Sequence, residues 1–256
     1  MVEKPFTPTS AEANELIGLA KEKDLILSIH HNRRWDSDFL TVRKLLQEKK
    51  LGSVVEYEAH FDRFRTEIKS GWKEEQENPG SGILYDLGSH LIDQALVLFG
   101  LPKAVYADIR IQRDGATVPD NFELLLYYSG LKVTLKAGML VKEKGPTFII
   151  HGTKGSFVKY GDDPQEEKMK EGLKPKDIQD WGKEPENIFG TLNTVEEKTK
   201  VPSEEGAYIK FYENIYRAIT ENEELKVKPE QARDVIKVIE TALKSQAEGR
   251  KIEFPV

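Results

Sequence analysis

The segment LYDLGSHLIDQALVLFG, residues 84–100, places a carboxylate and an imidazole one helical turn apart. At about 100° per residue, Asp86, His90 and Asp93 fall within about 60° of one another on one helix face. Side chains at positions i and i+4 are neighbours, so the Asp86 carboxylate can reach the His90 ring. A carboxylate that is hydrogen-bonded to an imidazole orients the ring and raises its basicity. Such a pair is suited to act as a general base.

Two other interpretations of this polar stripe stay open. The opposite face of the helix is apolar, so the stripe also fits an amphipathic helix whose polar side faces water. The apolar residues are Leu84, Leu87, Leu91, Ala95 and Leu98. A zinc site made by Asp86 and His90 is less favoured, because no further histidine stands at helical spacing to complete it.

The stretch GSGILYDLG, residues 80–88, is the nearest match to a dinucleotide-binding loop. Gly80 and Gly82 supply the first two glycines of G-x-G-x-x-G, but Tyr85 occupies the position of the third. The preceding WKEEQENP is not a strand, so the strand–turn–helix context is missing as well. We interpret these glycines, together with Pro79, as a sharp turn that enters the helix.

The elements on either side of this helix predict a protein with both helices and strands. Thr9 and Glu12 form a capping box for a first helix, and residues 25–31 are a short β-rich run. A second helix is expected within residues 32–52. Residues 53–65 alternate, which is typical of a strand with one covered face; Val55, Tyr57, Ala59 and Phe61 share that face.

The rest of the chain predicts further strands and two closing helices. Strands are expected within residues 104–112, 122–141 and 147–161, with hairpin turns at residues 129–130 and 153–155. Residues 161–205 are polar and contain four prolines, so they form either a functional lid or short hidden elements. Helices are expected around residues 211–219 and from Pro229 to Gly249.

The composition narrows the class of protein. There are 38 Lys and Arg against 44 Asp and Glu, so the formal charge is 38 − 44 = −6. This balance argues against nucleic-acid and anionic-membrane partners, which need a basic face. The chain has no cysteine, which excludes thiolate chemistry and fits a reducing compartment. Neither a secretory signal nor an apolar run of membrane-spanning length is evident. We therefore expect a globular cytoplasmic protein.

Three stretches become informative when they are taken together. They are EKP at residues 3–5, NRRWDSDFL at residues 32–40 and GSGILYDLGSHLIDQALVLFG at residues 80–100. In this order the chain resembles the Gfo/Idh/MocA family of NAD(P)-dependent sugar and polyol dehydrogenases, and within it the scyllo-inositol dehydrogenase branch. The resemblance extends through the residues HGTKGSFVKYG at 151–161 to the closing helices.

The resemblance implies an α+β fold with a large open sheet, mainly antiparallel or mixed and flanked by helices. It also implies that residues 1–31 are a remnant of a Rossmann domain. Residues 32–256 would be the C-terminal domain for substrate binding and oligomerisation. The glycine fingerprint and the acidic residue for the ribose would lie upstream of Met1. By this expectation the complete enzyme uses NADP or NAD, whereas this chain alone binds neither and is inactive.

The resemblance also implies roles for particular residues. Lys4 matches the family's catalytic lysine, His90 its proton-transfer histidine and Asp86 the acidic residue four positions earlier. Lys4 would stabilise the reacting oxygen while His90 takes the hydroxyl proton. The peptide bond between Lys4 and Pro5 is expected to be cis. Without the resemblance, Lys4 would be interpreted as an exposed terminal lysine.

Further residues are expected near the cofactor or the substrate. Those expected near the cofactor are Glu3, Pro5, Asn32 and Arg33, although a helix cap and a surface cation explain Asn32 and Arg33 equally well. Those expected to reach the polyol or sugar are Arg63, Arg65 and Tyr160, and ordinary solvent-facing side chains are the alternative. No metal site is expected.

The implied function has a rival from a different class. The expected enzyme oxidises a secondary alcohol of a cyclic polyol or sugar and forms a homo-oligomer through its sheet. The rival is a non-catalytic binding or assembly module in which Lys4, Asp86 and His90 are relics.

Overall fold

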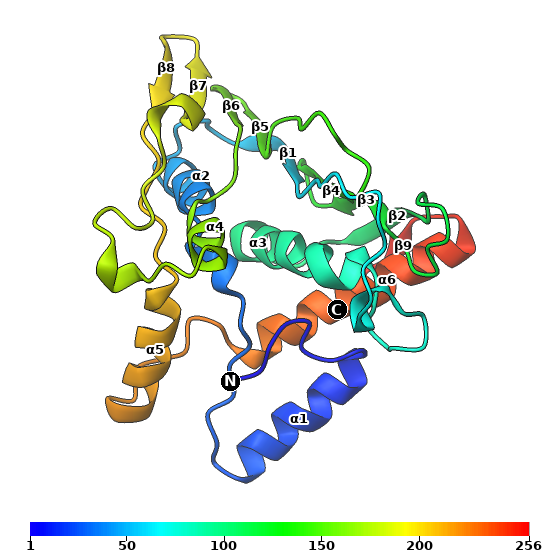
Figure 1. Cartoon of the computed structure of the whole chain (residues 1–256). Coiled ribbons are helices and arrows are strands. Elements are labelled where there is room, and N and C mark those ends of the chain that lie inside the picture. Colours follow the sequence, from blue (N-terminus) through cyan, green and yellow to red (C-terminus); the bar gives the residue numbers. More distant parts are fainter. Residues whose placement is uncertain (256) are drawn as a thin grey trace. The chain divides into compact units, whose positions relative to one another are not determined.

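The computed structural model of the chain describes residues 1–255. Its nine strands form one sheet in the order β8-β7-β6-β5-β1-β4-β3-β2-β9, and helices flank the sheet (Figure 1). The strand pairs with a resolved register, such as β3 with β4, are antiparallel. The predicted α+β fold with an open, mainly antiparallel sheet is therefore confirmed.

Contacts divide the chain into two compact units. Unit 1 contains Met1–His31, Glu58–Lys144 and Val227–Val256; unit 2 contains Asn32–Tyr57 and Gly145–Lys226. Strand β1 (Val54–His60) contributes to both units. As predicted, Tyr57, Ala59 and Phe61 are buried, whereas Val55 is 44% exposed. The predicted boundary after residue 31 stays a prediction.

Unit 1 combines the first and last helices with an antiparallel part of the sheet. Its elements are α1 (Ser10–Glu22), the π-turn η3 (Leu84–Gly88), α3 (Ser89–Phe99), α6 (Pro229–Glu248), the 3-10 turn η2 (Trp72–Glu74) and strands β2 (Ala104–Arg110), β3 (Asn121–Tyr127), β4 (Lys132–Gly138) and β9 (Ile252–Glu253). The predicted capping box of Thr9 and Glu12 begins α1. This helix lies beside α6 (Figure 1), where Ser10 donates two hydrogen bonds to Glu240.

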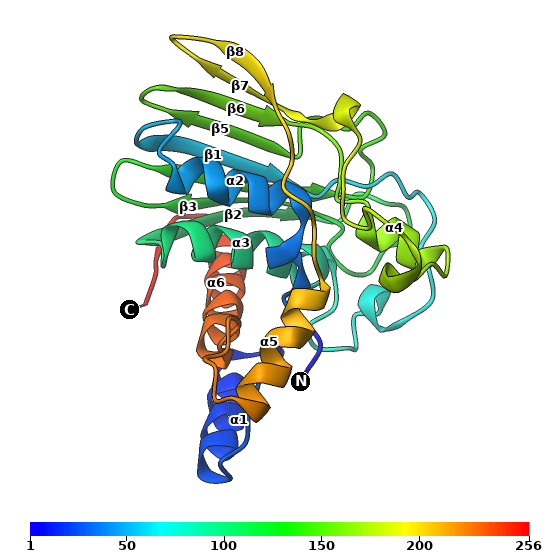
Figure 2. The ribbon, with the colours of Figure 1, turned by 90° about the vertical axis from the view of Figure 1, so that its left-hand side faces the viewer.

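Unit 2 combines a four-stranded part of the sheet with three helices. Its elements are the 3-10 turns η1 (Asn32–Trp35), η4 (Pro175–Asp177) and η5 (Glu186–Ile188), helices α2 (Ser37–Gln47), α4 (Gln165–Lys170) and α5 (Ile209–Thr220), and strands β5 (Phe148–Gly152), β6 (Gly155–Lys159), β7 (Gly190–Thr194) and β8 (Lys198–Val201). Figure 2 shows the four strands side by side. The Trp35 ring packs edge-on against Phe211, 5.8 Å away, so η1 is tied to α5.

Three local predictions need correction or completion. The predicted strand at residues 25–31 is wrong, because within residues 1–255 this run forms only one parallel bridge, between Val2 and Ile29. Residues 32–47 form a 3-10 turn followed by α2 rather than one helix. Residues 161–205 contain the short elements α4, η4, η5, β7 and β8. The prediction of short hidden elements in this segment is therefore confirmed.

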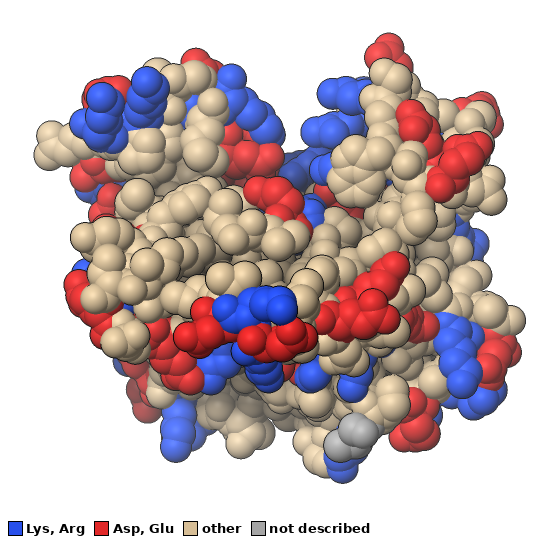
Figure 3. Space-filling model, turned by 90° about the horizontal axis from the view of Figure 1, so that it is seen from below, with Lys and Arg blue, Asp and Glu red and all other residues tan. Residues whose placement is uncertain are grey.

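Figure 3 shows the distribution of charged side chains on one face of the molecule. On the face drawn in Figure 3, acidic and basic side chains are interspersed. A nucleic-acid backbone would therefore meet carboxylates as well as cations on that face. Of the helices described between residues 1 and 255, none combines the length and the apolar character needed to cross a bilayer.

Candidate active site

The N-terminal segment of the chain places the Lys4 side chain in contact with Asp86. Val2 hydrogen bonds to the backbone of Ser28 and His30, which fixes the segment that precedes Lys4. The Lys4–Pro5 peptide bond is cis, as the resemblance implied. The Lys4 ammonium donates to the Asp86 carboxylate Oδ1 at 2.7 Å and to the Asp86 carbonyl at 2.5 Å. Both side chains are largely buried, with exposed fractions of 13% and 19%.

Asp86 lies in a π-turn, not in the regular helix that its spacing predicted. The turn covers Leu84–Gly88 and leads directly into α3. A Cβ at Gly88 would come within 2.9 Å of the Leu84 side chain and 3.2 Å of the Phe122 ring, so Gly88 packs tightly against both residues. A π-turn changes the angle between Asp86 and His90 from that of an α-helix, and such turns are frequent at functional sites.

A second ammonium holds the same carboxylate oxygen. Lys73 donates to Asp86 Oδ1 at 2.7 Å, the distance at which Lys4 also reaches it. Burial alone would raise the pKa of Asp86, but Lys4 and Lys73 outweigh it and hold this pKa below its usual range. Asp86 is therefore a carboxylate at neutral pH, paired with two cations.

His90 is buried one turn further along the chain. Its ring is 6% exposed and lies 6.3 Å from the Phe61 ring, centroid to centroid. Asp93, on the next turn of α3, lies 3.8 Å from His31, and both side chains are almost completely buried. The alternative of a solvent-facing polar stripe is therefore wrong for His90 and Asp93.

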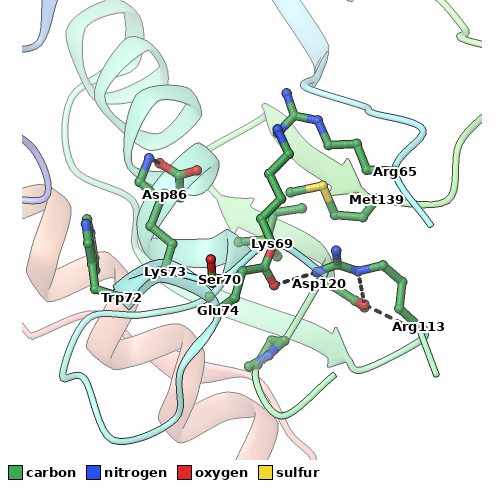
Figure 4. Close-up of a pocket in the computed structure, with 14 residues that line it drawn as sticks. Arg65, Lys69, Ser70, Trp72, Lys73, Glu74, Asp86, Arg113, Asp120 and Met139 are labelled. Atoms are coloured by element: carbon green, nitrogen blue, oxygen red, sulfur yellow. Dashed lines mark hydrogen bonds and ion pairs between the residues drawn. The ribbon is translucent and has the colours of Figure 1, made fainter. Parts of the chain in front are cut away.

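A pocket of about 270 Å³ opens beside Asp86. Figure 4 shows Lys73 against Asp86 at one end and Arg113 with Glu74 and Asp120 at the other. Arg113 is only 2% exposed and pairs with Asp120 at 2.8 Å and with Glu74 at 2.7 Å. The remaining wall is part apolar and part cationic; it includes Trp72, Ile83, Pro119 and Met139 as well as Arg65 and Lys69.

The other predicted residues are distributed as follows. Arg65 lines the pocket, whereas the Arg63 guanidinium stacks on the Phe61 ring at 4.6 Å. Glu3 lies 3.1 Å from His30, and Pro5 lies near Gly80. The remaining three belong to unit 2: Arg33 pairs with Asp36 and Glu166, Asn32 begins η1, and Tyr160 is 54% exposed.

Sequence reasoning missed Lys73, the Arg113 cluster and the pair of His31 with Asp93. Lys73 stands 13 residues before Asp86 in a stretch without periodicity, so its spacing carried no signal. The one available hint was the position of WKEE four residues before the glycine-rich turn.

The glycines at positions 80 and 82 do not form a cradle for a dinucleotide. Both have positive φ values, +81° and +86°, which confirms the sharp turn. A Cβ at Gly82 would approach the Pro119 carbonyl oxygen to 3.2 Å, so this glycine packs against the protein itself. No strand precedes the turn between residues 62 and 79. Within residues 1–255 these glycines therefore do not fit the phosphates of NAD or NADP. The same part of the chain contains no cluster of three or more metal-ligating residues.

Comparisons with known proteins agree on one family. The family profile described as "Oxidoreductase family, C-terminal alpha/beta domain", of the Gfo/Idh/MocA group, matches residues 43–254. The chain is 43% identical over 256 residues to scyllo-inositol 2-dehydrogenase (NADP(+)) IolW of Bacillus subtilis strain 168, covering 98% of this chain and 71% of that protein. It is 44% identical over 250 residues to the uncharacterized oxidoreductase YdgJ of Escherichia coli strain K12, covering 96% and 71%. The solved structure of the oxidoreductase YvaA from Bacillus subtilis superposes with a TM-score of 0.93 at 40% identity, covering 99% of this chain and 74% of that one.

Proposed function

Because this chain belongs to the Gfo/Idh/MocA oxidoreductase family, we propose that it binds the substrate of an NAD(P)-dependent dehydrogenase. The reaction is the oxidation of a secondary alcohol of a cyclic polyol or sugar, or its reverse. The observation that carries this proposal is the contact of Lys4 with Asp86 beside the pocket, at 2.7 Å. This contact joins the N-terminal segment to a turn 82 residues further along the chain, in agreement with the roles that the family resemblance implies.

The residues of the chain act on the oxygen of the alcohol. The Lys4 ammonium holds Asp86, and we propose that it also contacts the substrate oxygen. As the alcohol is oxidised, its O–H bond breaks, His90 takes the proton, and the ammonium of Lys4 stabilises the negative charge that develops on oxygen. The nicotinamide supplies the hydride acceptor in this class of reaction.

The substrate class is supported by two observations. The relative that is 43% identical is named for scyllo-inositol. The pocket combines the apolar surfaces of Trp72 and Ile83 with charged groups, a mixture suited to a ring that carries hydroxyls.

Domain organisation, assembly and location complete the proposal. Residues 1–31 are proposed as part of a dinucleotide-binding domain and residues 32–256 as the substrate domain. We also propose a homo-oligomer formed through the sheet and a cytoplasmic location. Exposed apolar side chains on and next to β2 support the proposed homo-oligomer: Tyr106 is 36% exposed and Ile111 is 52% exposed.

The first experiment titrates the chain with NADPH and NADH by nicotinamide fluorescence, with the intact mass checked in parallel. We expect no binding at micromolar concentrations. The chain is then extended at its N-terminus with the dinucleotide domain of the 43% identical relative and assayed with a panel of inositols and sugars. Turnover that is lost in Lys4→Met and in His90→Gln is the expected result. An extended protein that binds NADPH but oxidises none of the panel would favour the non-catalytic assembly module instead.

A further inference from the structure

Two lysine side chains from different parts of unit 1 contact the Asp86 carboxylate. Lys4 comes from the N-terminal segment and is 13% exposed, whereas Lys73 comes from the loop before the π-turn and is 49% exposed. Both ammonium groups lie 2.7 Å from the same oxygen, Oδ1. One carboxylate therefore contacts two ammonium groups, and the three groups together have a net charge of about +1 at neutral pH.

This surplus charge matters for the reaction proposed above. If Asp86 were paired with Lys4 alone, the two charges would cancel, and the pair would do little for a developing alkoxide. With Lys73 on Asp86, the charge of Lys4 is no longer fully offset. Preorganised positive charge where negative charge develops is the usual source of stabilisation at such sites.

Lys73 is held in place by contacts on both sides of it. Its carbonyl accepts a hydrogen bond from the Gly82 N–H at 2.9 Å, which ties the loop to the turn that begins the Asp86 segment. The next residue, Glu74, pairs with Arg113, and Arg113 pairs with Asp120. The Arg113 side chain is 2% exposed and that of Asp120 is 1% exposed. This buried cluster fixes the backbone from which the Lys73 side chain reaches Asp86.

We propose that Lys73 is a positioning residue of the active site, which neutralises Asp86 so that the charge of Lys4 is available to the substrate oxygen. The proposal rests on the proposed function and adds to it a residue outside the Lys4, Asp86 and His90 set. Lys73 acts through Asp86 and is not assigned a contact with the substrate.

Lys69 provides a matched control. It lines the same pocket, stands four residues earlier in the same loop and carries the same charge. In Figure 4 its side chain extends toward the side where Arg65 lies, away from the Asp86 end. Lys69→Met therefore removes a positive charge from the pocket and leaves the Asp86 contacts in place, whereas Lys73→Met removes one of them. Lys73→Arg keeps the charge.

The first test uses the chain as it stands. Carbon-13 NMR of labelled aspartate follows the titration of the Asp86 carboxyl, which is assigned with Asp86→Asn. Besides Lys4 and Lys73, the charged groups around the pocket are Arg65, Lys69, Glu74, Arg113 and Asp120. We expect Lys73→Met to raise the pKa of Asp86, and Lys73→Arg and Lys69→Met to leave it unchanged. An unchanged pKa in Lys73→Met, or an equal rise in Lys69→Met, would overturn the proposal.

The second test measures turnover in the chain extended with the relative's dinucleotide domain. Losing a charged hydrogen bond that matters only in the transition state should lower kcat by about 10- to 100-fold with KM almost unchanged. Lys73→Arg and Lys69→Met should stay within about threefold of the parent, because neither removes the cation from Asp86. A rise in KM at constant kcat would instead make Lys73 a substrate-binding residue and refute the proposed role.

The two tests separate this proposal from the proposed function. An active parent whose turnover is insensitive to Lys73→Met refutes the role of Lys73 alone. If the parent is inactive on every alcohol while Lys73→Met still raises the pKa of Asp86, the proposed function is refuted. The catalytic role of the contact between Lys73 and Asp86 is then refuted as well.

Discussion

The buried ion pair of Lys159 and Glu184 allows a quantitative prediction about unit 2. Both side chains are 0% exposed, and the ammonium lies 2.9 Å from Glu184 Oε2. Lys159 also donates to the Tyr160 carbonyl, and the carboxylate accepts from the hydroxyls of Ser37 and Ser203. Lys159→Met would leave a carboxylate with two hydroxyl donors and no cation. Leaving one buried charge unpaired costs about 3–5 kcal/mol of unfolding free energy.

The double variant makes this prediction sharper. Glu184→Gln alone leaves the ammonium unpaired and should cost a similar amount. In Lys159→Met with Glu184→Gln, neither charge of the pair remains and the amide oxygen can still accept from a serine hydroxyl. We therefore expect the double variant to lose only about 1–2 kcal/mol, less than either single variant.

Urea unfolding followed by tryptophan fluorescence is the assay. Trp35 and Trp181 are buried in unit 2, so a Trp72→Phe background reports on that unit. With a slope of about 2 kcal/mol per molar urea, Lys159→Met should lower the midpoint by about 1.5–2.5 M. Lys183→Met, which breaks the exposed pair with Asp180, is the control and should change stability by less than about 0.5 kcal/mol. Additive single effects, or a loss below about 1 kcal/mol, would refute the reasoning.

Two further predictions concern the same unit. Burial raises the pKa of Asp36 to about 7, although Arg33 opposes this shift. The folded state therefore holds the Asp36 proton more tightly than the unfolded state does. The contribution of Asp36 to the free energy of unfolding should then fall as the pH rises from about 4 to 7, by at most about 1.4 kcal/mol per pH unit. Urea midpoints across that range should show the fall, and Asp36→Asn should flatten it. A Cβ at Gly182 would lie 1.8 Å from the Gly206 carbonyl oxygen, so Gly182→Ala should cost about 1–3 kcal/mol in thermal unfolding. Gly145→Ala, with open space around the Cβ position, should be nearly neutral.

The elements that sequence predicted well are those decided by neighbours along the chain. The capping box needs only Thr9 and Glu12, and the hairpin of β5 and β6 needs a short turn between two β-rich runs. The elements that it missed depend on distant residues. The π-turn at Leu84–Gly88 could not be predicted, because a helical wheel assumes the regular α-helical period and contains nothing about the residues packed around the turn. Residues 25–31 have β composition, yet their only described bridge partner is Val2.

The candidate site divides along the same line. The motif around Asp86 and His90 stands out in the sequence because its members are four residues apart, and the resemblance pointed to Lys4; the catalytic roles of the three stay predictions. Lys73 could not, because an irregular loop brings it to Asp86, and that loop is held by Glu74 and Arg113 through contacts spanning 39 residues. Charge spacing along a sequence is informative only where the backbone is regular.

The charged groups at and beside the pocket differ in how firmly they are held, and this difference bears on specificity. Lys4 and Asp86 are mostly buried, and Asp86 lies in a π-turn, so the group that the proposed function assigns to the reacting oxygen has a fixed position. Arg65 and Lys69 are exposed and can adopt different rotamers at little cost. Under the proposed function, substitutions at Arg65 should therefore change which polyol is bound. Loss of the Lys4 contact should instead slow the reaction of every polyol, because that contact acts on the oxygen that all of them share.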